Sequence, residues 1–133
     1  GRSALMIAAM RNKPRTAAAA AAAGCILDRS FLVYGTALHM AAFNGAAATC
    51  RELCRCGAAI EAVNATFLQT PLLVASSRGH AEVISTLLEE RANARARDKD
   101  GLNALSLAQM KRSSAAAEVL LAHLAASRVA TIS

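Results

Sequence analysis

Three cysteines lie close together in the middle of the chain, and their spacing is the feature that most directly suggests metal or thiol chemistry. Cys50, Cys54 and Cys56 form the pattern C-x3-C-x-C. A structural zinc site usually combines such cysteines with further Cys or His ligands. Free cysteine also packs in protein cores as a small apolar side chain. The positions of the three residues within their secondary-structure elements distinguish these two interpretations.

The other candidates for catalysis are the three histidines, His39, His80 and His123. The residues around them form no Ser–His–Asp set, no pair of carboxylates and no glycine-rich phosphate loop. We therefore expect no catalytic site and no enzymatic activity. For the same reason we expect no cofactor and no bound metal.

Positive charge exceeds negative charge, with 15 Lys and Arg against 9 Asp and Glu, a formal net charge of +6. A field of this sign steers a protein toward acidic partners. Asp98 and Asp100 interrupt one of the basic groups and reduce its field. The basic residues fall into three loose groups, which also fit a solvated surface: Arg11, Lys13 and Arg15; Arg91, Arg95, Arg97 and Lys99; and Lys111 and Arg112.

The composition favours closely packed helices. There are 34 alanines, three Phe, one Tyr and no Trp, so small side chains must fill the interior. The longest apolar stretch, residues 17–27 counting Gly24, has eleven residues, whereas a membrane-spanning helix needs about 20. Four cysteines, Cys25 among them, are too few and too clustered for a secreted disulfide framework. We expect a reduced, intracellular setting and no transmembrane segment.

A period of 33 or 34 residues runs through the chain. A small or polar residue opens each unit at Ser3, Thr36, Thr70 and Asn103, at intervals of 33, 34 and 33 residues. Leu follows each opener two positions later, and Ala follows five positions later. Such a period is typical of repeat proteins, in which each unit buries its apolar face against the next unit.

The third unit reads Thr70-Pro71-Leu72, then Arg78-Gly79-His80, then Leu87-Leu88, and the second contains Gly35-Thr36-Ala37-Leu38-His39. These strings resemble the ankyrin-repeat family. The resemblance implies an all-α solenoid of about four helix-turn-helix units with short extended fingers, forming a single domain over residues 1–133. We expect the units at about residues 3–35, 36–69, 70–102 and 103–124, with a C-terminal tail at 125–133.

Local chemistry agrees with these helix positions. Thr36 and Thr70 are suited to cap a helix by accepting from amides of its first turn. Pro71 fits the first helical position, where a missing N–H is harmless. Gly45 and Gly79 are expected to follow a helix in left-handed backbone conformation.

Within the period, Cys50 and Cys54 occupy positions that are apolar in the next unit, so we favour core packing over a metal site for them. The resemblance implies structural roles for His39 and His80, as residues that tie one unit to the next. The segment Asp98-Lys99-Asp100-Gly101 predicts a turn in the third finger.

In the family's layout, finger tips and the exposed ends of first helices line one concave face. Aromatic and arginine side chains are common anchors at protein interfaces. We therefore predict a non-catalytic protein–protein interaction module whose partner has an acidic or mixed surface. The partner-binding residues expected on this face are Phe43, Phe67, Leu68, Arg78, Arg97, Lys99, Met110 and Lys111, with Phe31, Leu32 and Tyr34 mapping there as well.

The alternative is a structural accessory subunit of a large intracellular assembly that contacts RNA or acidic surfaces through its excess of arginine. Nucleic acid takes second place because the aromatic and basic residues do not alternate along a sheet or groove. Salt dependence separates the two hypotheses, since phosphate binding weakens steeply with ionic strength.

Overall fold

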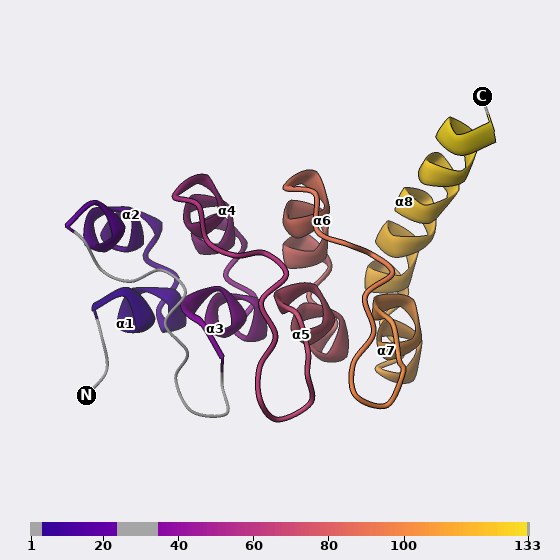
Figure 1. Ribbon diagram of the computed structural model, residues 1–133, viewed down its shortest axis with the longest axis horizontal. Coiled ribbons are helices and arrows are strands. Elements are labelled where there is room, and N and C mark those ends of the chain that lie inside the picture. The colour runs from indigo at the N-terminus through magenta and orange to yellow at the C-terminus, as the bar shows by residue number, and fades with distance from the viewer. Residues whose placement is uncertain (1–3, 24–34, 133) are drawn as a thin grey trace.

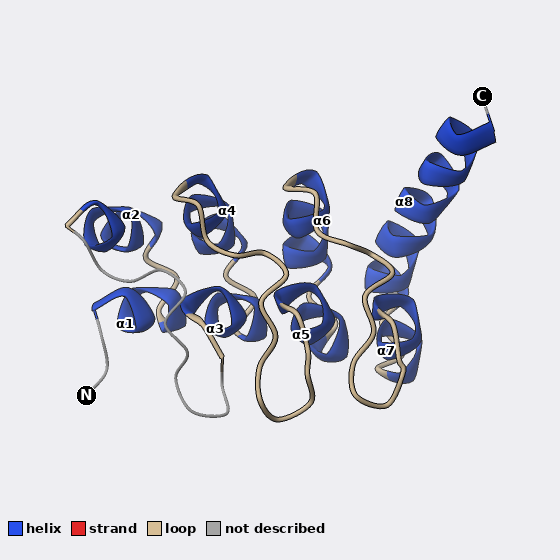
Figure 2. Ribbon diagram, viewed as in Figure 1, coloured by secondary structure: helices blue, strands red, loops and turns tan. Residues whose placement is uncertain are grey.

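The computed structural model describes residues 4–23 and 35–132. Apart from one isolated antiparallel bridge between Arg97 and Asn103, these residues form only helices, turns and loops (Figure 2). The all-α class predicted from the sequence is confirmed. The helices are α1 (Ala4–Met10), α2 (Pro14–Ala22), α3 (Ala37–Phe43), α4 (Ala47–Arg55), α5 (Pro71–Arg78), α6 (Ala81–Glu89), α7 (Ala104–Met110) and α8 (Ser114–Ile132).

The helices form two rows (Figure 1). Helices α1, α3, α5 and α7 make up what we call the inner row, and α2, α4, α6 and α8 make up the outer row. Each helix packs against its neighbours in the same row and against the adjacent helix of the other row. This arrangement is the solenoid that the sequence predicts.

Alanine and leucine fill the space between the rows. Ala41, Ala75 and Ala108, each five positions after an opener, are completely buried, and Leu38 and Leu72 are each only 1% exposed. Because an alanine side chain ends at Cβ, neighbouring helices can approach closely at these positions. This packing agrees with the low aromatic content of the chain.

Each turn between an inner helix and the following outer helix has a left-handed residue at the same repeat position. Asn12, Gly45, Gly79 and Arg112 have φ of 51°, 73°, 73° and 61°. At Gly45 a side chain would also be crowded, because a Cβ atom would lie 3.0 Å from Nδ1 of His80, which would have to shift. His80 itself donates from Nε2 to the carbonyl of Phe43 at 2.9 Å, and this bond joins two successive helix pairs.

The helix starts follow the local signals. Thr70 accepts from the amide of Leu73 at 3.3 Å, and Pro71 occupies the first turn of α5. Asn103 plays the same part for α7 by accepting from the amide of Ser106 at 2.9 Å. Each of these capping bonds joins residues within the first turn of the helix, so the sequence alone can predict it.

Helix α8 has 19 residues and runs to Ile132, so the segment 125–133 that we set apart as a tail begins inside a helix. The proposed unit boundaries otherwise stay a prediction. In the described part of the chain, no helix combines the length and hydropathy that a bilayer crossing requires. Gly24, Cys25, Phe31, Leu32 and Tyr34 fall outside the described residues.

Candidate functional site

Two loops project beside the inner row, on the same side of the molecule (Figure 1). We call residues 58–69, before α5, the second finger, and residues 92–102, before α7, the third finger. The buried side chain of Asn64 organises the second finger, because its Oδ1 accepts from the amides of Phe67 at 3.2 Å and Gln69 at 3.1 Å. These bonds fix where the Phe67 ring stands.

The third finger turns at the position that the sequence predicts. Asp98 Oδ1 accepts from the amides of Asp100 at 2.9 Å and Leu102 at 3.0 Å, and Gly101 has a φ of 79°. The amide of Lys99 donates to the carbonyl of Phe67 at 2.9 Å. The two fingers are therefore held together by a main-chain bond.

His39 anchors the second finger to α3. Its Nδ1 accepts from the amide of Thr36 at 3.1 Å and also lies 3.0 Å from the Thr36 hydroxyl, while its Nε2 lies 2.8 Å from the carbonyl of Gln69. Because an amide only donates and a carbonyl only accepts, the ring proton sits on Nε2. Burial lowers the pKa of His39 below its usual 6.5, although the bond to Gln69 opposes this shift. The neutral ring is the form that makes all these contacts.

A groove of about 550 Å³ lies between the fingers and the inner row. Buried apolar side chains from three successive inner helices, Met40, Val74 and Leu107, line it. Phe43 and Phe67 also line it, yet they remain 45% and 46% exposed. Apolar side chains are therefore accessible to a ligand in this groove.

A cation covers each of these two rings. The Arg78 guanidinium lies 4.4 Å from the centre of the Phe43 ring, and Lys99 Nζ lies 4.9 Å from the centre of the Phe67 ring. Both distances fall in the range of cation–π attraction. Arg78 of α5 covers a ring of α3, and Lys99 of the third finger covers a ring of the second finger, so both contacts join successive repeats and hold the groove in shape.

The comparisons with known proteins agree with this architecture. A family model described as ankyrin repeats, three copies, matches residues 38–130. The chain belongs to the ankyrin-repeat family. It is also similar to Alpha-latrotoxin-Lg1a of Latrodectus geometricus, with 38% identity over 74 residues, and this match covers 55% of the chain but only 5% of that relative.

Ankyrin repeats are generally protein–protein interaction modules, and the family is generally non-catalytic. Apolar side chains and charges of both signs meet in the groove of this ankyrin chain. Asp98 and Asp100 line the groove together with Arg78. The sequence predicted the turn that carries both carboxylates and their weakening of a basic group, but not their place in the groove.

Three of the eight expected partner-binding residues line the groove, namely Phe43, Phe67 and Arg78. The other five lie elsewhere on the surface of the repeats. Leu68 and Met110 are 48% and 68% exposed, and Arg97 donates to the carbonyl of Gly101 at 3.2 Å. Lys99 and Lys111 are exposed, and Lys99 covers the Phe67 ring.

Cys50 and Cys54 lie on α4, and Cys56 directly follows this helix. Cys50 is buried, whereas Cys54 and Cys56 are partly buried. Cys50 is fully buried, and burial raises its pKa to about 12. Cys54 is half-buried, and burial raises its pKa to about 11. Thiols with such pKa values are protonated near neutral pH, which makes them poor nucleophiles and poor metal ligands. Within residues 4–23 and 35–132, no cluster of three or more His, Cys, Asp or Glu side chains is placed to hold a metal ion.

Proposed function

We propose that the groove binds a segment of a partner protein and that the segment inserts an apolar side chain between Phe43 and Phe67. The observation that carries this proposal is the pair of half-exposed rings facing buried apolar side chains in one groove. Burying a phenylalanine ring contributes about 1.5–3 kcal/mol, so two rings make a substantial anchor. Cations on both rings keep them oriented before the partner arrives.

The partner segment carries charges of both signs. Arg78 and Lys99 lie over the rings, while Asp98 and Asp100 add carboxylates to the same groove. A mixed surface therefore fits better than a purely acidic one, because an acidic run would meet the two carboxylates. Partner contacts extend from the groove to the nearby surface expected from the sequence, namely Leu68, Arg97, Met110 and Lys111.

A pull-down from cells tests the face, with the wild-type chain compared with Phe43→Ala, Phe67→Ala and Arg97→Glu. We expect each phenylalanine variant to lose partner recovery by about tenfold or more, as truncation of an interface hot spot does. Leu121→Ala is a matched control, because Leu121 is 50% exposed on α8 and away from the groove. Unchanged recovery with both phenylalanine variants would refute the proposal.

The second candidate function is an accessory subunit that contacts RNA through its arginines. Arg78, which lines the concave groove, already covers the Phe43 ring, which weakens this candidate. Binding that falls steeply as salt is raised would support the RNA role, whereas the apolar groove predicts a shallow dependence.

A further inference from the structure

The positive charge of the chain is concentrated in its first half. Residues 1–60 contain seven Lys and Arg but only two Asp and Glu, whereas residues 61–133 contain eight and seven. The helix α2 contains no acidic residue at all, and α4 contains Arg51 and Arg55 with the single acid Glu52. Arg15 of α2 and Arg51 and Arg55 of α4 bring part of this excess to the outer row near the N-terminal end of the described repeats.

A second groove, of about 520 Å³, lies between α2 and α4. We call it the outer groove, since both helices belong to the outer row. Small side chains, Pro14, Ala18 and Ala48, line its two sides. Pro14 and Ala18 are partly buried and Ala48 is exposed, whereas Ala17 and Ala20 of α2 are buried in the packed contact. None of the residues of the concave groove takes part in it.

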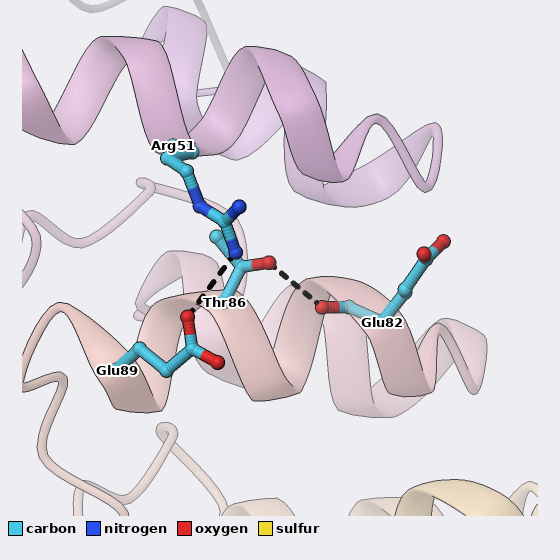
Figure 3. Close-up of polar contacts among 4 residues, drawn as sticks. All are labelled: Arg51, Glu82, Thr86 and Glu89. Atoms are coloured by element: carbon cyan, nitrogen blue, oxygen red, sulfur yellow. Dashed lines mark hydrogen bonds and ion pairs between the residues drawn. The ribbon is translucent and has the colours of Figure 1, made fainter.

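Longer, charged side chains complete the outer groove, namely Arg15 from α2 and Arg51, Glu52 and Arg55 from α4. On the side of α4 that faces α6, Arg51 donates to Glu89 at 3.1 Å (Figure 3). Within α4, Arg55 pairs with Glu52 at 3.2 Å.

Helix α2 provides no carboxylate that could compensate the positive charges of the outer groove. It contributes a further cation instead. Arg15 makes no ion pair with any residue that the structure describes. Three guanidinium groups thus surround the outer groove with one carboxylate among them.

We propose that the outer groove binds an acidic segment of a protein, with carboxylates of that segment placed between Arg15 and the arginines of α4. Guanidinium groups bind carboxylates through paired, charge-assisted hydrogen bonds. Exposed ion pairs such as Arg51–Glu89 are weak, so Arg51 exchanges its partner at little cost. The carboxylate of Glu52 repels the closely spaced phosphates of a nucleic acid. An acidic peptide can place its carboxylates on either side of Glu52.

This site is separate from the groove of the proposed function, and the two contact different parts of a partner. The outer groove selects acidic sequence, and the concave groove selects apolar side chains. An ankyrin chain with both holds a partner by two segments at once, and linking two weak contacts raises the affinity of the whole.

Fluorescence anisotropy with a labelled hexaglutamate peptide tests the outer groove on the full 133-residue chain. We expect the double variant Arg15→Gln/Arg51→Gln to bind the peptide about tenfold more weakly, since it removes two of the three cations. The matched control, Arg95→Gln/Arg112→Gln, removes the same charge from exposed positions elsewhere and changes the affinity by less than about twofold. Thermal unfolding verifies that both variants fold.

Single variants separate binding from the loss of the Arg51–Glu89 ion pair. Glu89→Gln breaks the same pair but leaves the cation free, so peptide binding strengthens or stays equal. Glu52→Gln removes the opposing carboxylate and strengthens binding. Phe43→Ala leaves hexaglutamate binding unchanged, so failure of the concave groove is distinguishable from failure here.

Three results would overturn the proposal. Equal losses in the groove variant and the control would mean that net charge alone attracts the peptide. An unchanged affinity in Arg15→Gln/Arg51→Gln would place binding elsewhere. Tighter binding of a single-stranded oligonucleotide of equal charge, dependent on the same two arginines, would assign the outer groove to nucleic acid instead.

Discussion

At the scale of single residues, His39 couples stability to pH. Its folded-state pKa is lowered from 6.5 by burial, so the unfolded chain takes up the proton at a higher pH than the folded chain does. The stabilisation is complete above pH 6.5 and is lost as the pH falls below that value toward the folded pKa. We expect the free energy of unfolding to fall by at most about 1.4 kcal/mol per pH unit in that range.

Urea unfolding at a series of pH values from 7.5 downward measures this effect. The variant His39→Leu provides the comparison, because Leu73 occupies the same position in the following repeat and is fully buried there. The variant loses the bonds to Thr36 and Gln69 but has no proton to take up. If its stability declines with acid as steeply as that of the wild type, His39 is not the responsible group.

Arg91 is a second residue whose backbone predicts a measurable effect. It follows α6 with a φ of 70°, at the repeat position where Gly57 follows α4 with a φ of 96°. Side chains other than glycine are strained in this region by about 1–2 kcal/mol. We expect Arg91→Gly to raise the free energy of unfolding by about 1 kcal/mol. Arg95→Gly, at an exposed position without positive φ, should give no such gain in the same denaturation assay.

At the scale of elements, the second finger depends on Asn64. Its side chain accepts two amide bonds in a buried place, so Asn64→Ala leaves the amides of Phe67 and Gln69 without this acceptor. We expect a loss of about 1–3 kcal/mol in the free energy of unfolding. Asn44→Ala, at an exposed residue after α3, is the control and should change stability by less than about 0.5 kcal/mol. Equal losses in urea unfolding would mean that the finger is not held by Asn64.

Sequence reasoning located the helices because their signals are local. Thr70, Pro71 and the left-handed residue Gly79 act within one or two turns of the helix they delimit. The contents of the groove depend instead on contacts between segments. Asp98 reaches it only because the third finger bonds to Phe67, and no spacing within one repeat encodes that bond.

The expected binding surface also shows that contacts between repeats could not be predicted from the sequence. The family's layout placed Phe43 at the exposed end of a first helix, whereas Phe67 on its finger could equally have packed against a neighbouring finger. Their pairing with Arg78 and Lys99 did not follow, because each pair joins two repeats and requires the stacking distance. The outer groove was hidden for the same reason, as it exists only where α2 and α4 face each other.

At the scale of the whole molecule, the alanines set the spacing of the rows. Ala75 is completely buried between neighbouring helices, so a larger side chain must push them apart. We expect Ala75→Leu to lower the free energy of unfolding by about 1–3 kcal/mol. The same change at Ala122, which is exposed on α8, should be nearly neutral. Chemical denaturation compares the two, and a neutral Ala75→Leu would contradict close packing of the inner row.

Among residues 4–23 and 35–132, the main helix contacts lie within one helix pair or between successive pairs, from α1 to α8. A pulling force along the row of repeats would therefore pass in series from one helix pair to the next. Each pair can give way as a separate step, which makes the row of repeats extensible stepwise.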